Sequence, residues 1–150
     1  MEEDFAQMQP VRARVRFDYR GVAVPGRLFI GHKGAAEASA ALRDRATANL
    51  KYEVEQGIRV EDVDSGHETY VLIDPATDQE VAYSPVYVVV QADSIEDLAD
   101  FILRDEFRTI EILDPPELTL SPQEIGRLLA RANQRLRTMA QLVVRRSERY

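Results

Sequence analysis

Three arginines alternate with apolar residues in the segment 11–19, and they are the first side chains of this chain that could bind an anion. The segment reads VRARVRFDY, so Arg12, Arg14 and Arg16 fall on one face of an extended strand. Guanidinium groups suit phosphate because each presents several donors in a fixed fork. The row is therefore a candidate anion or nucleic-acid site.

A second candidate for the same chemistry is the loop 31–34, Gly-His-Lys-Gly, in which His32 and Lys33 lie between two glycines. It precedes a predicted helix, whose free N–H groups favour anions, and a Gly-x-x-Gly loop can clamp a single nucleic-acid strand. A plain strand-to-helix turn is the alternative. No aromatic residue alternates with the arginines of 11–19 on their own face, so no stacking platform is predicted.

The sequence favours a protein that is not an enzyme. It has no cysteine, and it lacks the Walker A, G-x-G-x-x-G and G-x-S-x-G motifs. The two histidines, His32 and His67, lie in different loops, and a metal site of two imidazoles and a carboxylate would need them to converge. We therefore predict no catalytic residues, no metal and no cofactor. A small enzyme that depends on carboxylates or on His67 remains the alternative.

The last helix, predicted from about 122 to 146, carries the clearest pattern. Its apolar stripe follows 4-3-4-3-4 spacing, which is the heptad repeat of pairing helices. The stripe consists of Ile125, Leu129, Ala132, Leu136, Met139 and Val143. It either packs on the protein's own sheet or forms the interface of a dimer. Arg127, Arg131 and Arg135 form a row on another side of the helix, which either faces solvent or binds an anionic partner.

Charge is segregated along the chain. Residues 122–150 contain seven arginines against two glutamates, whereas residues 51–121 contain eighteen acidic residues against four basic ones. The pI near 4.9 is unlike that of a dedicated nucleic-acid binder. We therefore expect the basic surfaces to pair with acidic protein surfaces, within the chain or between subunits.

The elements that position these residues alternate between strands and helices. Turn residues are expected at Arg20-Gly21 and at 64–68, and Gly57 is a plausible stop for the first helix. The segment 48–56 fits either a helix or a strand. Val86–Val90 is apolar on both faces, which predicts a central strand. Strands are predicted at 11–19, 22–30, 58–63, 70–74, 81–90 and 107–113, and helices from about 35, from Ser94 and from Pro122.

The helix that opens at Ser94 is expected to bury Ile95, Leu98, Ala99, Ile102 and Leu103. Together with the strands on either side of it, it predicts one βαβ crossover. The fold class is therefore α+β, with a mainly antiparallel sheet and a long C-terminal helix, and a ferredoxin-like sandwich is one arrangement of it. We expect a single domain over 1–150, with a flexible N-terminus at 1–10, a core at 11–113 and an amphipathic helix at 121–146.

The leading hypothesis is a non-catalytic interaction or regulatory domain that forms a homodimer through its last helix. The alternative is an RNA- or other nucleic-acid-binding domain that uses the arginine-lined strand, the loop 31–34 and the last helix. No apolar run approaches the roughly 20 residues that span a bilayer, and the acidic start lacks a signal-peptide core, so we expect a cytoplasmic protein without a membrane partner.

Overall fold

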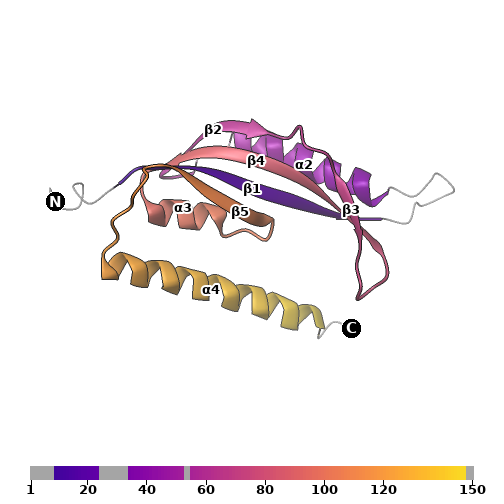
Figure 1. Ribbon diagram of the computed structural model, residues 1–150. Coiled ribbons are helices and arrows are strands. Elements are labelled where there is room, and N and C mark those ends of the chain that lie inside the picture. Colours follow the sequence, from indigo (N-terminus) through magenta and orange to yellow (C-terminus); the bar gives the residue numbers. More distant parts are fainter. Residues whose placement is uncertain (1–8, 24–33, 53–54, 148–150) are drawn as a thin grey trace.

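The described residues of this protein form one sheet of five strands, and helices connect several of them. The computed structural model describes residues 9–23, 34–52 and 55–147, with side chains as far as Arg145. In the described part, the strand order is β2-β4-β1-β5, and β3 pairs with β4 as well. The elements are β1 (Val11–Val22), α2 (Ala35–Tyr52), β2 (Ile58–Asp64), β3 (Tyr70–Ile73), β4 (Glu80–Ala92), α3 (Ile95–Ile102), β5 (Phe107–Asp114) and α4 (Pro122–Ser147) (Figure 1).

The predicted α+β class is confirmed, and the topology is that of two interlocked split βαβ units. Strands β4 and β5 are both antiparallel to β1, so they are parallel to each other, and α3 connects them across it. In the same way, β1 and β2 are both antiparallel to β4 and are connected by α2. This is the arrangement of a ferredoxin-like sandwich, with β3 added beside β4. The sequence predicted only the unit formed by β4, α3 and β5.

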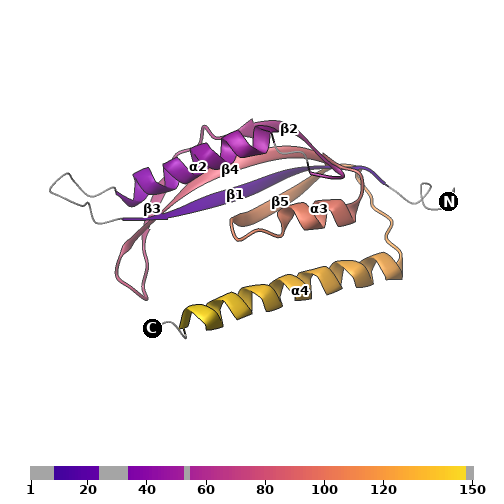
Figure 2. The same cartoon turned by 180° about the vertical axis from the view of Figure 1, so that it is seen from behind.

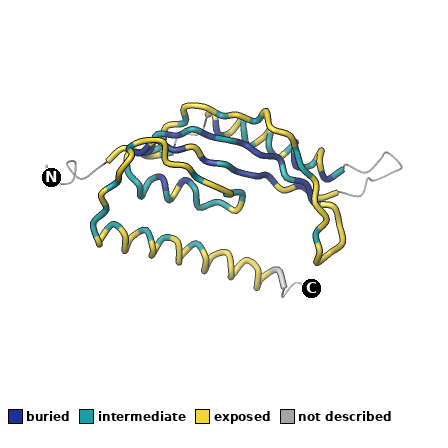
Figure 3. The backbone as a smooth tube through the Cα atoms, viewed as in Figure 1, coloured by how far each residue is buried: buried dark blue, intermediate teal, exposed yellow. Residues whose placement is uncertain are grey.

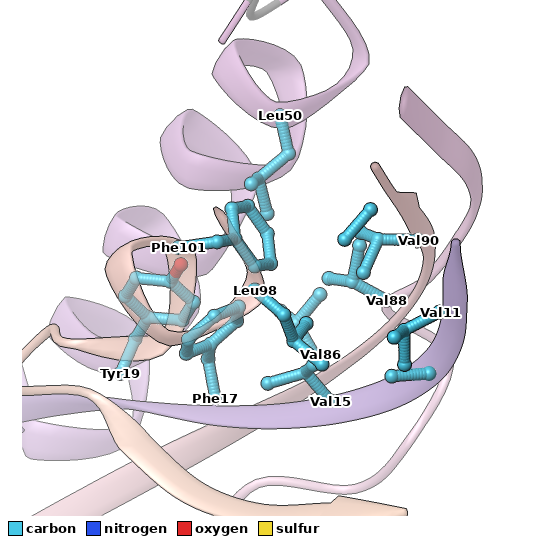
Figure 4. Packing of buried hydrophobic residues seen from close by; sticks show 12 residues of the cluster. Val11, Val15, Phe17, Tyr19, Leu50, Val86, Val88, Val90, Leu98 and Phe101 are labelled. Carbon is cyan, nitrogen blue, oxygen red and sulfur yellow. The ribbon is translucent and has the colours of Figure 1, made fainter. Parts of the chain in front are cut away.

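The core depends on the long antiparallel ladder between β1 and β4. Side chains alternate between faces along a strand, and the odd-numbered residues of β1 from Val11 to Tyr19 are buried. They lie opposite buried residues of β4, such as Val88 across from Val15. The two helices cover this face with Leu50 from α2 and with Leu98 and Phe101 from α3 (Figure 4).

The central strand β4 contains a proline, Pro85, at a position where the sheet needs no backbone donor. It lies opposite Asp18, whose N–H donates to Glu106 on the far side of β1 and therefore points away from β4. The pair is thus not hydrogen-bonded across the β1–β4 ladder, and Pro85 is not needed as a donor there. On its other side, β2 pairs from Tyr87 onward and β3 pairs as far as Tyr83. Pro85 therefore lies between two ladders, where its missing N–H costs nothing.

The prediction of a turn at Arg20-Gly21 is wrong, because β1 continues through both residues to Val22. Gly21 serves close packing instead of a turn. A Cβ at this position would lie 2.2 Å from the Ser39 backbone nitrogen and 2.6 Å from the Ala35 carbonyl oxygen of α2. The strand predicted at 22–30 and most of the loop 31–34 fall outside the described residues.

The first helix ends before the predicted stop at Gly57. It ends at Tyr52, so 48–52 is helical, and residues 53–54 fall outside the described part. Gly57 is therefore not the stop residue of this helix. It lies in the turn before β2 with a φ of +77°, a conformation that glycine adopts without strain.

The other two helices begin where the sequence predicted, and a serine side chain caps each of them. Ser94 accepts a hydrogen bond from the Asp97 amide, and Ser121 accepts one from the Glu124 amide. Helix α3 has eight residues and is shorter than expected. Leu98 is buried as predicted, but the second fully buried residue is Phe101, which the predicted stripe omitted. Its ring packs edge-to-face against Phe17, with 5.7 Å between the ring centroids.

Replacing Gly21 with alanine should destabilise the protein by about 1–3 kcal/mol, because the new methyl group meets the backbone of α2 and cannot be accommodated by a side-chain movement. Urea denaturation followed by circular dichroism measures this loss. The matched control is Gly126→Ala in α4, where a Cβ meets no atom within 4 Å. The control should leave stability unchanged or raise it by up to about 1 kcal/mol. Equal stability of the two variants would contradict this account of Gly21.

Candidate functional site

Arginines spaced four residues apart hold α4 against the acidic α3 and the loop that follows it. We call Arg127, Arg131 and Arg135 the arginine row. The last of them donates a hydrogen bond of 3.1 Å to Asp105. The predicted pairing of basic with acidic surfaces therefore occurs within one chain, and the row does not form a free solvated face. The ion pairs are Arg127–Glu96, Arg131–Glu96, Arg131–Asp100 and Arg135–Asp105.

This attachment leaves the apolar stripe of α4 exposed. Successive residues advance by about 100° around a helix, so the stripe points well away from the arginine row. Leu129 and Leu136 are 66% and 65% exposed, and Val143 is 62% exposed. Ile125, Ala132 and Met139 are also exposed. The interpretation in which the stripe packs on the protein's own sheet is therefore wrong, and most of α4 is exposed along its length (Figure 3).

The apolar stripe of α4 is exposed because of where this helix lies. Both views of the chain place α4 beside α3, on the side away from α2 and below the sheet (Figures 1 and 2). The core-facing surface of the sheet is already covered by α2 and α3, whose leucines and phenylalanine fill the core. No described side chain of α4 belongs to this core. The stripe is thus left exposed.

The predicted arginines of β1 lie on the opposite side of the sheet from α2 and α3, which we call the open face. Arg12 pairs with Glu61 at 2.8 Å, and Arg16 pairs with Asp18. Arg14 forms no ion pair with any described residue, and its guanidinium lies 5.8 Å from the ring centre of Tyr87. The other predicted anion-binding residues, His32 and Lys33, fall outside the described part of the chain.

The centre of the open face is a buried carboxylate, that of Asp18. It accepts two hydrogen bonds from Arg16, at 2.8 and 3.0 Å, and one of 2.6 Å from the Tyr70 hydroxyl. Arg108 of β5 lies 3.4 Å away. The hydrogen bond to Asp18 raises the pKa of Arg16, and burial followed by the contact with Asp18 raises the pKa of Tyr70. These contacts tie three strands together beneath the arginines.

Aromatic rings do alternate with the arginines, and this corrects the sequence-based expectation. The rings come from β4 and not from β1: Tyr87 lies opposite Arg16, and Tyr83 lies opposite Arg20. Arg108 lies over the Tyr83 ring at 4.9 Å, and Tyr70 stacks on the same ring. The pattern within β1 alone could not reveal this alternation, because the rings belong to another strand. The sequence signal for it is the spacing of four residues between Tyr83 and Tyr87, which places both rings on one face of a strand.

His67 lies at the surface, in the segment that connects β2 and β3. Its ring lies 4.5 Å from that of Tyr87, and its Nε2 is 3.1 Å from Asp64. The Gly66 amide and then His67 lower the pKa of Asp64. His67 does not line the cavity of about 450 Å³ beside β1. Among the described residues, no three His, Asp or Glu side chains are grouped so that they could hold a metal ion.

Comparison with known proteins identifies no relative of this chain. No family model matches it, and neither a curated protein nor a solved structure matches it. None of the described helices combines the length and the apolar character needed to cross a membrane. The function is therefore inferred from the surfaces themselves.

Tyr70 should ionise at higher pH than an ordinary tyrosine, because its pKa is raised from 10.0 in the folded protein. The unfolded phenol loses its proton first, so the contribution of Tyr70 to stability is present below about pH 10 and is lost as the pH rises through its folded pKa. A tyrosinate absorbance titration of the wild type minus that of Tyr70→Phe isolates this group. A difference curve centred at or below pH 10 would contradict the burial of Tyr70 and its contact with Asp18 as causes of the raised pKa.

Proposed function

We propose that this chain is a non-catalytic interaction domain that forms a homodimer by pairing α4 of one copy with α4 of another. The observation that carries the proposal is the exposed apolar stripe on a helix whose arginine row is already bound to its own body. Large exposed apolar patches on soluble proteins are typical of interaction surfaces. The ion pairs between the arginine row and α3 orient α4 so that its apolar stripe points away from α3.

The spacing of the stripe supports a second copy of α4 as its partner. A 4-3-4-3-4 pattern places apolar residues every 3.5 residues, and such a seam is buried best by another helix with the same repeat. Identical stripes on two copies meet this condition about a two-fold axis. Burying a leucine side chain fully is worth about 1.5–3 kcal/mol, so Leu129 and Leu136 alone supply a substantial driving force.

Replacing Leu136 with aspartate should convert the dimer into a monomer, because a dimer interface would then have to bury an unpaired carboxylate. Size-exclusion chromatography with light scattering over a range of protein concentrations measures the mass. The helix and the core should survive, since Leu136 is 65% exposed. Circular dichroism checks this directly.

The matched control for this experiment is Gln141→Asp. It introduces the same charge in the same half of α4, at an exposed position on another side of the helix. The control should leave the dimer intact. A wild-type chain that is monomeric at high concentration, or equal masses for Leu136→Asp and wild type, would refute the proposal.

A second candidate function is the binding of single-stranded nucleic acid on the open face. The observation that favours it is the alternation of Tyr83 and Tyr87 with arginines across β1 and β4. A sheet with aromatic side chains and cations on one face is a surface on which bases can stack. Arg14, which lacks an ion pair with any described residue, would be the side chain closest to a bound phosphate.

A labelled uridine oligonucleotide tests this candidate by fluorescence anisotropy at increasing salt. Tyr87→Ala should weaken binding by about 1–3 kcal/mol through lost stacking, and Arg14→Ala should lower the slope of affinity against salt by about 1. The control is Arg137→Ala on the exposed surface of α4, which should change neither quantity. Absence of binding at low salt would eliminate this candidate.

A further inference from the structure

Strand β1 is longer than its neighbour β5, and the difference leaves a free edge inside the sheet. In the described part of the chain, the β1–β5 pairing runs from Arg12 only to Phe17, and the Asp18 amide donates one further hydrogen bond to Glu106. From Tyr19 to Val22, β1 pairs with β4 on its other side. Figure 1 shows β1 continuing past β5.

The main-chain groups of Arg20 point toward this free edge. Groups two residues apart on a strand point the same way, and the Asp18 N–H points toward the β5 side. In the described part of the chain, no strand pairs with Arg20 on that side. Its N–H and C=O are therefore available to an added strand. An unpaired edge of this kind is the feature that extended peptides recognise.

The free edge borders a cavity of about 450 Å³, which falls within the size range of binding sites. Leu42 and Ala46 of α2 line it on the core side of the sheet, and Tyr83 and Arg108 line it on the open-face side. Leu42 lies about two turns before the buried Leu50 on α2, yet it is 41% exposed. It is exposed here because β5 does not extend far enough to cover it.

The charges around the cavity favour an acidic occupant. Asp18 and Asp105 also line it, but arginines already bind both carboxylates. Arg20 lies 3.9 Å from Asp74, at the limit of an ion pair, and no described carboxylate lies within ion-pair distance of Arg45. The remaining carboxylate, Glu106, does not balance both arginines. An occupant with carboxylates would complete these pairs.

We propose that the free edge of β1 at Arg20 binds an extended segment of a partner protein as an added strand, in which apolar residues alternate with acidic ones. Alternation follows from the two walls of the cavity. Successive side chains of an added strand point to opposite faces, so one set meets Leu42 and Ala46 while the other meets Arg20 and Arg108. This site is separate from the apolar stripe of α4.

A fluorescein-labelled peptide of alternating valine and glutamate is the probe, measured by anisotropy at physiological salt, where long-range repulsion from the net charge of −7 is screened. We expect saturable binding. The same peptide with lysine in place of glutamate should bind at least tenfold more weakly. The peptide with N-methyl groups on alternate residues should not bind, because it cannot form the ladder. Equal binding of all three peptides, or none by any, would overturn the proposal.

A matched pair of variants at Arg20 separates the main chain from the side chain. Arg20→Pro and Arg20→Thr both remove the guanidinium, but only proline removes the N–H that faces the free edge. Proline is tolerated there because that N–H takes no part in the β1–β4 ladder. We expect Arg20→Thr to weaken binding several-fold and Arg20→Pro to abolish it. Equal affinities of the two variants, with both folded by circular dichroism, would contradict strand addition.

The exposed residue Leu42 provides an independent test should Arg20→Pro fail to fold. Leu42→Asn places a polar side chain at a partly exposed position and removes the apolar wall of the cavity. It should weaken binding of the valine–glutamate peptide at least tenfold. Arg137→Ala on α4 is the control and should bind as the wild type does. Unchanged affinity of Leu42→Asn would refute the site.

Discussion

The antiparallel ladder between β1 and β4 is the constraint on which the rest of this structure depends. Its register places valines and Phe17 on one face, where α2 and α3 cover them, and arginines and tyrosines on the other. The core and the open face are therefore two consequences of one pairing. A shift of one residue would exchange them and bury the arginines. Asp18 stabilises the open face because it accepts hydrogen bonds from Arg16 and Tyr70.

Charge, and not apolar packing, decides the position of α4. An amphipathic helix commonly buries its apolar side and exposes its charged side. Here the acidic residues of α3 bind the arginine row, and the sheet surface that could have covered the stripe is already occupied by α2 and α3. Three acidic residues from the middle of the chain, Glu96, Asp100 and Asp105, thus form an internal docking surface for the last helix. The same arrangement presents leucines to the surroundings.

The elements of this fold follow from local patterns, whereas their contacts do not. Alternation in 11–19, the apolar run at 86–90 and the apolar stripes of the last two helices are sufficient to predict strands and helices. The prediction of a turn at Gly21 is wrong because glycine is needed there for close packing against the backbone of α2, which is distant in sequence. The pairing of Tyr87 with Arg16 depends on a register between distant segments. The orientation of α4 depends on which side meets Asp100, and no pattern within the helix contains that information.

The ion pairs between α3 and α4 give the attachment of α4 a temperature dependence different from that of apolar packing. Hydration of charged groups becomes less favourable as temperature rises, so the cost of desolvating an ion pair falls. Apolar contacts gain little over the same range. Arg127 and Arg131 share Glu96, and Arg131 also binds Asp100, so these four side chains form a connected network. Arg135 forms a separate pair with Asp105. Warming therefore loosens the part of α4 held by this network less than the part held by the single Arg135–Asp105 pair.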